Sequence, residues 1–442
     1  MMGRPSIFTL TLACLSVLAV RPEFLPGKAN AGAPGQDCNP GYMPVVFLHG
    51  FLASGDTYSG QVQRFIDQGY CPDRLRVFDW NTLGGGARAA LGKLDTFVDR
   101  VLAETQSSKI NLVGHSAGGG LGYAYLADPA RAGKVAHYVH IGSGVQPRPA
   151  GPAGEVPTLN LFSEGDLVVK GKEIPGAKNI RFSALDHYEV ATSAETFREM
   201  FGFFNPGKAV LVEKTRKIKW IPISGRVISL GENTPQAGAT VQIYALDPDT
   251  GNRTSAAPQA VFTADSSGHW GPWRARSGTY YEFFVETGKT GERPVHYYLE
   301  PFRRPNALVY LRTLPGSGSP ASLLLAGLPR KEDQSVLAIF SASRAVIHGR
   351  DSLVAEGHVL SSAGLCPAEK TVIAMFLYDN GDSQTSLSPH PGFQVMRSFL
   401  TGADLFAPAS PPASLKLRFN GRSMSVPNWN SARDGVSVAV FE

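Results

Sequence analysis

The stretch NLVGHSAGGGLGYAYL, from Asn111 to Leu126, holds a single serine, Ser116, inside the pattern G-x-S-x-G. An apolar run typical of a strand precedes this serine, and a run with helical character follows it. Glycines permit the strained backbone that holds a nucleophile at the tip of a strand-to-helix turn, and the helix N-terminus favours the negative charge that develops beside it. The stretch therefore predicts that Ser116 is a nucleophile. The other interpretation is a glycine-rich packing turn.

Strand-like and helix-like runs alternate from about residue 40 to residue 205. Such alternation predicts a parallel sheet that is covered by helices on both faces. We expect strands at residues 45–48, 75–78, 110–113, 135–141, 158–162 and 179–182. Apolar residues at helical spacing predict helices within residues 61–70, 90–106, 120–133 and 194–204. The glycine-rich residues 81–93 are expected to form a mobile flap.

A serine hydroxyl needs a general base, and the base needs an acid that orients it. In a fold of this kind, the order along the chain is nucleophile, acid, base. His187 follows the strand at 179–182 and precedes the last helix, so a loop can aim it at Ser116. Asp166 follows the strand at 158–162, at the sheet edge where such proteins carry out their chemistry. We therefore predict that Asp166 is the acid and His187 the base.

Other titratable residues fit these two roles less well. Glu164 is kept as an alternative acid. Asp186 is interpreted as a surface residue because adjacent side chains diverge in an extended loop, and Asp79 precedes the serine in the chain. His137 and His140 lie within one strand and are interpreted as core or sheet-face residues.

An oxyanion hole needs two backbone N–H groups close to the nucleophile. The residue after the serine, Ala117, supplies one, and Phe51 in the loop after the first strand supplies the other. Gly50 lets that loop turn toward the substrate, and His49 is interpreted as a structural histidine that holds it. Each donor of this kind stabilises a transition state by about 3–4 kcal/mol.

The character of the sequence changes after residues 205–207, where helical periodicity disappears. Short β-rich runs cut by turn residues predict a β-sandwich in residues 209–314 and a further all-β domain in residues 321–442. Residues 315–320 have the composition of a linker. The catalytic domain would then occupy residues 32–208.

Residues 1–31 are expected to be a signal peptide. Arg4 provides the positive start, residues 7–20 are apolar, and Ala29-Asn30-Ala31 offers a cleavage site. A membrane anchor is the rival interpretation, but the apolar run is short for spanning a bilayer. No later run is apolar enough to cross one, so we expect secretion, to the periplasm or outside the cell, without stable membrane insertion.

Three cysteines lie beyond the expected signal peptide. Cys38 and Cys71 each precede a predicted strand, and neighbouring parallel strands would place both cysteines near the same end of the sheet. A disulfide between them is plausible in an exported protein, and two buried free thiols are the alternative. Cys366 would remain unpaired.

Composition limits the functions that the chain can have. Its 442 residues exceed one typical domain, and a net charge of +5 without a charged block does not suggest nucleic-acid binding. No cofactor or metal is expected. The acidic run from Asp247 to Asn252 is interpreted as a turn rather than a calcium site.

The segments FLHGF, GHSAGG, SEGD and LDHYEV follow one another in the order of a known family. Through them, residues 44–205 resemble the catalytic domain of α/β-hydrolase lipases of bacteria and archaea. The resemblance implies that the nucleophile, acid, base and oxyanion donors are Ser116, Asp166, His187, Phe51 and Ala117.

The arrangement of β domains behind a hydrolase is similar to that of an archaeal-type lipase whose C-terminal part takes up lipid. Residues 222–290 separately resemble a carboxypeptidase-regulatory-like or transthyretin-like sandwich, through ISGRV, AGATVQIY and ADSSGHW. The gaps after residue 141 and between Asp166 and His187 are too short to hold a helical cap, so only a minimal cap is expected.

The sequence thus predicts a secreted serine carboxylic ester hydrolase, most simply a lipase that acts on triacylglycerols or other fatty acyl esters. An insoluble polyester such as a polyhydroxyalkanoate is an alternative substrate. A non-catalytic surface-binding protein with a vestigial hydrolase domain is the alternative from another class.

Overall fold

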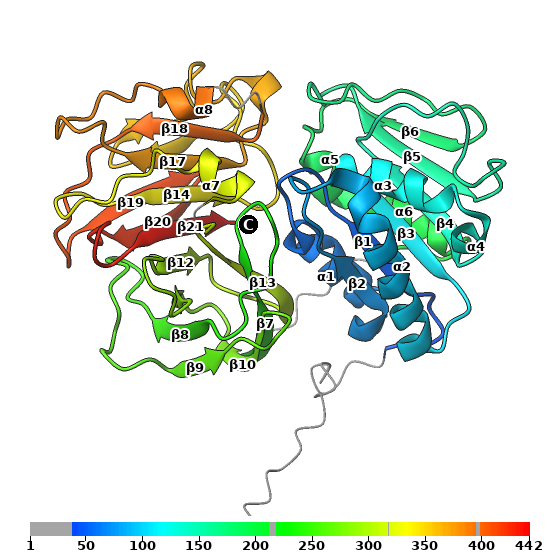
Figure 1. Cartoon of the computed structure of the whole chain (residues 1–442), viewed down its shortest axis with the longest axis horizontal. Helices are drawn as coiled ribbons and strands as arrows, with labels where there is room; N and C mark the ends of the chain where they lie inside the picture. Colours follow the sequence, from blue (N-terminus) through cyan, green and yellow to red (C-terminus); the bar gives the residue numbers. More distant parts are fainter. Residues whose placement is uncertain (1–37, 212–217, 317, 395–397) are drawn as a thin grey trace, which may run out of the picture. The chain divides into compact units, whose positions relative to one another are not determined.

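A six-stranded parallel sheet organises the first half of the chain (Figure 1). The computed structural model describes residues 38–211, 218–316, 318–394 and 398–442, so the expected signal peptide lies outside the described residues. The strand order is β2-β1-β3-β4-β5-β6, and all pairings are parallel. The strands are β1 (Val45–Leu48), β2 (Leu75–Phe78), β3 (Ile110–His115), β4 (Val135–Ile141), β5 (Thr158–Ser163) and β6 (Lys178–Phe182). Every strand expected in this half is present.

Helices cover both faces of this sheet (Figure 1). Because strand side chains alternate between faces, Leu48 of β1 packs with Leu94 of α2, whereas Phe47 packs with Phe65 of α1. The helices are α1 (Ser59–Asp67), α2 (Gly86–Thr105), α3 (Ala117–Leu126), α4 (Pro129–Ala132), α5 (Glu189–Thr192) and α6 (Ala194–Phe204), with 3-10 turns at Gly55–Tyr58 and Pro72–Arg74. Helices α2 and α3 share one apolar cluster, and α1 and α6 share the other.

The flap expected at residues 81–93 is largely absent, because α2 already begins at Gly86. Only residues 81–85 remain outside the helix, and the side chain of Asn81 accepts hydrogen bonds from the backbone N–H groups of Leu83 and Gly84. The alanines and leucine that follow Gly86 are strong helix formers, and they outweigh the glycines in this stretch.

The described residues of the second half of the chain form three β-sheets. A three-stranded sheet contains β10 (His269–Arg276), β7 (Trp220–Ser229) and β13 (Asn306–Thr313). An eight-stranded sheet contains, in order, β18 (Leu400–Asp404), β17 (Ala374–Tyr378), β14 (Leu337–Ser341), β21 (Val436–Phe441), β12 (Val295–Leu299), β11 (Tyr281–Glu286), β8 (Thr240–Ala245) and β9 (Ala260–Thr263). A four-stranded sheet contains β16 (His358–Val359), β15 (Leu353–Ala355), β19 (Ser414–Phe419) and β20 (Arg422–Pro427). Short helices α7 (Pro320–Leu324) and α8 (Pro391–Gln394) and a 3-10 turn at Ala368–Lys370 connect the strands.

Most pairings in these three sheets are antiparallel, but β7–β13, β12–β21, β14–β21 and β17–β18 are parallel. The predicted fold class, a parallel α/β domain with a minimal cap followed by mainly antiparallel β-sheets, is confirmed. Two of the parallel pairs, β12–β21 and β14–β21, involve the last strand of the chain, which returns to the middle of the eight-stranded sheet. Strand β21, at the end of the described chain, lies between β12 and β14.

The eight-stranded sheet joins the two segments expected to be separate β domains. Strand β12 comes from residues 209–314 and β21 from residues 321–442, and they pair through Val295–Val436 and the residues that follow. One apolar cluster likewise contains Phe283 from the first segment and Phe376 from the second. The linker at 315–320 therefore separates two stretches of sequence that share one sheet and one core.

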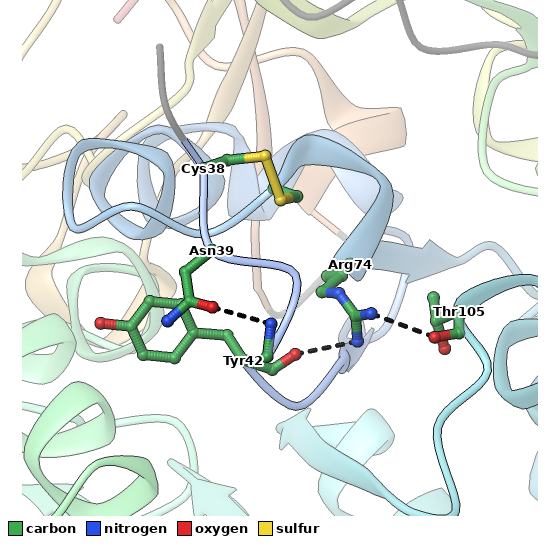
Figure 2. Close-up of a disulfide and its surroundings, with 7 residues drawn as sticks. Cys38, Asn39, Tyr42, Arg74 and Thr105 are labelled. Atoms are coloured by element: carbon green, nitrogen blue, oxygen red, sulfur yellow. Dashed lines mark hydrogen bonds between the residues drawn. A yellow bond between two sulfur atoms is a disulfide. The ribbon is translucent and has the colours of Figure 1, made fainter.

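A disulfide joins Cys38 and Cys71 at the start of the parallel sheet (Figure 2). Their Cα atoms lie 4.9 Å apart, and the two cysteines precede the neighbouring parallel strands β1 and β2. In the same region, Arg74 donates hydrogen bonds of 3.0 Å to the carbonyl oxygens of Tyr42 and Thr105. Cys366 is a buried free thiol.

We expect reduction of this disulfide to lower the free energy of unfolding by about 2–4 kcal/mol, because the bond closes a loop across a sequence separation of 33 residues. Urea unfolding with and without dithiothreitol measures the difference. A Cys38→Ser/Cys71→Ser variant is the control, since its stability should not respond to the reductant. Equal stability of the oxidised and reduced wild-type protein would contradict the expectation.

Candidate active site

Ser116 lies between β3 and α3 in a backbone conformation that is unusual for a residue with a side chain. Its φ is 54° and its ψ is −120°, which matches the strained turn that exposes a nucleophile. A Cβ on Gly114 would lie 2.4 Å from the carbonyl oxygen of Gly118, and a Cβ on Gly118 would lie 2.3 Å from the carbonyl oxygen of Leu48. The two glycines of the G-x-S-x-G pattern are therefore required by backbone contact.

The structure brings the predicted acid and base to this serine. His187 Nε2 lies 3.0 Å from Ser116 Oγ, and His187 Nδ1 lies 2.7 Å from Asp166 Oδ2. The carboxylate can only accept, so Nδ1 carries the proton and Nε2 presents its lone pair to the serine hydroxyl. The three side chains come from three different loops, each at the carboxyl end of a parallel strand or just beyond it.

The environment keeps Asp166 ionised. Burial of the side chain opposes ionisation, but the hydrogen bond from His187 and those from the backbone N–H groups of Val168 and Val169 outweigh it, so the pKa of Asp166 is lowered. The ionised carboxylate fixes the tautomer of His187 and can stabilise an imidazolium.

His115, next to the nucleophile, also supports His187. Its Nε2 donates a 2.8 Å hydrogen bond to the carbonyl oxygen of His187. Burial and the neighbouring His187 lower the pKa of His115 to about 3, so the ring is neutral at neutral pH. Its Nδ1 is then an acceptor without a hydrogen-bond partner among the described residues.

The two predicted oxyanion donors belong to backbone segments close to Ser116. Ala117 is the first residue of α3, and the first N–H groups of a helix have no partner inside it. Phe51 follows Gly50, where a Cβ would lie 3.1 Å from the Cβ of Ser116, so this loop approaches the serine closely. The backbone of the two loops can therefore present N–H groups to an oxygen bound at Ser116.

His49 holds the Phe51 loop, as its sequence context suggested. The ring is fully buried, its Nδ1 donates to the carbonyl oxygen of Gly50 at 2.9 Å, and its Nε2 accepts from the backbone N–H of Trp80 at 3.1 Å. Asn233, from the β7–β8 turn, donates to the carbonyl oxygens of Ala53 and Trp80. We call residues 209–314 and 321–442 the two β segments. The loop that carries Phe51 is thus held by the first of them, which is far away in the sequence.

One of the remaining candidates lies where the sequence suggested, Glu164 does not take the role of alternative acid, and Asp186 is more buried than expected. Glu164, kept as the alternative acid, pairs with Arg181 on the surface, and His187 contacts Asp166 instead. His140 is buried and contacts the carbonyl oxygen of Gly144. Asp186 was expected at the surface, but it is only 2% exposed because its carboxylate is enclosed by hydrogen bonds, including one from Arg350.

The other two candidates also lie outside the triad. His137 is partly exposed on the sheet and contacts the side chain of Asn111 at 2.9 Å. Asp79 pairs with Arg226 of β7 and accepts hydrogen bonds from Tyr310 and from the backbone N–H of Gly55. It therefore helps to join the parallel sheet to the β segments.

A mainly apolar cavity lies beside His187. It is lined by Leu52, which follows Phe51, by Tyr188, which follows His187, and by Phe399, whose ring stacks on that of His187 at 5.7 Å between centroids. Further apolar wall residues are Leu230, Leu299, Leu308, Leu325, Phe340, Phe376 and Val440, and the charged side chains of Asp56, Arg312 and Glu442 line another part of the wall. The cavity is thus built from the parallel-sheet segment and from both β segments.

Nothing in the described part of the chain gathers three or more histidine, cysteine or acidic side chains in a way that could hold a metal ion. Asp247 forms a turn, in which its carboxylate accepts from the backbone N–H groups of Asp249 and Thr250. No helix among the described residues has the length and apolar character needed to cross a membrane.

Comparison with protein families assigns most of the chain. Residues 43–167 match the alpha/beta hydrolase fold, residues 219–314 match the lipase C-terminal domain, and residues 341–442 match a third model of a C-terminal domain. The chain is an α/β-hydrolase of the lipase and esterase type. The resemblance carried by the four short segments is therefore confirmed.

Solved structures similar to the hydrolase include two bacterial enzymes. The lipase BlEst2 of Bacillus licheniformis, in its mature form, shares 14% identity at a TM-score of 0.32, over 39% of this chain and 96% of that one. The esterase RhEst1 of Rhodococcus sp. ECU1013 shares 17% identity at a TM-score of 0.31, over 38% of this chain and 92% of that one.

Sequence reasoning missed several residues that support the hydrolase site. Phe399, Asn233 and Arg350 are remote in the sequence, and no local pattern marks them. Asp186 and Glu189 do carry a signal, because they have the spacing of a capping box. The Asp186 carboxylate accepts from the backbone N–H of Glu189 at 2.8 Å, and the Glu189 carboxylate accepts from that of Asp186 at 3.2 Å.

We expect the free energy of unfolding of the hydrolase to fall with pH already below about 6.5, which is well above the pH range in which carboxylates titrate. Burial lowers the pKa of His49, of His115 to about 3 and of His140 to about 4. Below pH ~6.5 the unfolded chain binds protons at these residues while the folded chain does not, so stability falls as pH drops, by up to about 1.4 kcal/mol per unit for each histidine.

Urea unfolding between pH 7 and pH 4.5 measures this dependence. His140→Gln should show a shallower slope, because one of the three buried rings no longer titrates. His358→Gln, at an exposed position, is the matched control and should keep the wild-type slope. A wild-type slope in His140→Gln would show that this ring does not contribute.

Proposed function

We propose that the protein is a secreted serine carboxylic ester hydrolase, a lipase that cleaves triacylglycerols and other fatty acyl esters through an acyl-enzyme on Ser116. One observation carries the proposal. Ser116, His187 and Asp166 form a continuous hydrogen-bonded series, and His187 stacks on Phe399, which lines a mainly apolar cavity. The hydrogen-bonded series supplies a nucleophile, and the cavity suits an acyl chain.

The proposed reaction follows from the contacts of His187. Its Nε2 accepts the proton of Ser116 as Oγ attacks the ester carbonyl carbon, and Asp166 stabilises the imidazolium that forms. The N–H groups of Phe51 and Ala117 donate to the oxyanion. The imidazolium then protonates the alcohol, which leaves. Water next attacks the acyl-enzyme by the same route and releases the fatty acid.

The cavity supports a substrate with a long apolar chain. Its lining residues Leu52 and Tyr188 each adjoin a predicted site residue in the chain, and much of the remaining wall comes from the β segments. Lipid or another hydrophobic ester is therefore the proposed partner, and the β segments would receive its acyl chain. An apolar chain that leaves water for this cavity gains about 0.8 kcal/mol per buried CH₂ group.

Export of the protein is proposed on two grounds. Residues 7–20 are apolar and precede a small-residue cleavage site, and the Cys38–Cys71 disulfide is typical of oxidising compartments. Mass spectrometry of protein recovered outside the cytoplasm tests this part, since cleavage after Ala31 predicts a chain that begins at Gly32.

Ser116→Ala should lower kcat for a p-nitrophenyl ester by at least about 10⁴-fold, because the nucleophile is removed while the fold remains. Ser107→Ala, which lies outside the site, is the matched control and should keep its activity. Turnover by Ser116→Ala at a rate close to that of the wild type would remove Ser116 from the mechanism.

Leu308→Trp should lower activity on long-chain triacylglycerol emulsions several-fold more than activity on tributyrin, because the larger side chain fills part of the cavity. Ala307→Trp is the control, since residue 307 is exposed and does not line the cavity. Equal losses on both substrates would disconnect the cavity from the acyl chain. Wild-type activity confined to polyester films would favour the depolymerase alternative.

A further inference from the structure

A loop of the C-terminal β segment packs against the short segment that carries His187. This β14–β15 loop, residues 342–352, follows β14 and is far from the triad in the sequence. The carbonyl oxygen of Ser343 accepts a hydrogen bond from Thr192 of α5, and the backbone N–H of Ala345 donates to Asp186 Oδ2 at 3.1 Å. The loop therefore contacts both sides of the base.

Asp186, directly before His187, uses both carboxylate oxygens. Oδ1 accepts from the backbone N–H groups of Tyr188 and Glu189, each at 2.8 Å. Oδ2 accepts from Ala345 and from Arg350 Nη2 at 2.9 Å. One carboxylate thus holds the backbone on the far side of His187 and connects it to the β segment.

The guanidinium of Arg350 contacts three carboxylates. Besides Asp186, its Nη1 contacts Glu189 Oε2 at 2.9 Å, and its Nε contacts Asp351 Oδ2 at 2.8 Å. Asp351 is itself held, because its carboxylate accepts from the backbone N–H of Ile347 and from the amide of Asn420. The planar fork of an arginine fits this arrangement, whereas a lysine could not make all three contacts in the same geometry.

The base needs such support because it stands on a connection rather than on a regular element. Strand β6 ends at Phe182 and α5 begins at Glu189, so His187 lies in the loop between them. Its two catalytic distances, 3.0 Å to Ser116 and 2.7 Å to Asp166, must nevertheless be kept. A misplacement of about 1 Å can lower a rate by about 10²-fold.

We propose that Arg350 is a positioning residue for ester hydrolysis: by holding Asp186 and Glu189 it fixes the backbone that carries His187, and it makes the C-terminal β segment part of the catalytic apparatus. This inference rests on the proposed function. Phe399, which comes from the same β segment and stacks on the ring of His187, restrains the ring in a second way.

The test compares Arg350→Ala with Arg304→Ala in the full-length chain. Arg304 also links a β segment to a carboxylate of the hydrolase domain, Asp67 of α1, at 2.7 Å, and its side chain is 32% exposed against 27% for Arg350. The substrate is p-nitrophenyl butyrate, whose short acyl chain makes little use of the cavity. We expect Arg350→Ala to lower kcat by about 10- to 100-fold with KM within about twofold of the wild type, and Arg304→Ala to leave both unchanged.

Three further measurements separate positioning from a general loss of stability. Reaction of Ser116 with a p-nitrophenyl phosphonate should slow in proportion to kcat, because it needs the same base. Millimolar guanidinium should restore part of the kcat of Arg350→Ala without changing Arg304→Ala. The double variant Asp186→Asn/Arg350→Ala should be no slower than Arg350→Ala, because the two residues act through one contact.

Equal kcat losses in Arg350→Ala and Arg304→Ala, or a higher KM with unchanged kcat, would overturn the inference. If Arg350→Ala does not fold, Arg350→Lys is compared with Arg304→Lys. A several-fold loss of kcat in the first alone supports the inference, and equal values overturn it. A wild-type protein that neither hydrolyses the ester nor reacts with the phosphonate would refute the proposed function itself.

Discussion

The arrangement of the site depends on one close backbone contact. Strand β3 and helix α3 meet at Ser116, and Gly118 lies so near the end of β1 that a Cβ would be 2.3 Å from the carbonyl oxygen of Leu48. This contact places the serine beside the loop that follows β1 and aligns the start of α3 with it. The position of Ser116 beside the loop that follows β1 is therefore fixed by backbone packing within the parallel sheet, and the Asn233 side chain then holds that loop from outside the sheet.

The base is fixed in another way, by charge. His187 stands on a loop, and the carboxylates on either side of it, Asp186 and Glu189, would repel each other without a cation between them. Arg350, from a distant part of the chain, pairs with both carboxylates, and Arg344 of the same loop also pairs with Glu189 at 3.3 Å. Removing Arg350 would leave the Asp186 carboxylate, which is only 2% exposed, without its ionic partner. An unpaired buried charge of this kind is strongly destabilising. The β segments thus take part in the geometry of the site.

The sharing of one sheet by residues 209–314 and 321–442 makes this coupling rigid. Because β21 pairs with both β12 and β14, neither segment can move without breaking backbone hydrogen bonds. Two β segments then reach the hydrolase at different points. Asn233 holds the loop of Phe51, and the β14–β15 loop holds that of His187. The mainly apolar cavity is lined by residues of the same three parts of the chain.

By itself the sequence determined the parallel sheet, its six strands, the nucleophile turn and the order Ser116, Asp166, His187, because these depend on local periodicity and on residues at fixed places beside strands. It also placed Cys38 and Cys71 at one end of neighbouring strands. Only the tertiary structure decided that Asp186 is buried, that α2 replaces most of the expected flap, and that both β segments share a sheet. These features arise from contacts between residues far apart in the chain, such as Asp186 with Arg350 and β12 with β21, and such contacts leave no local pattern to read.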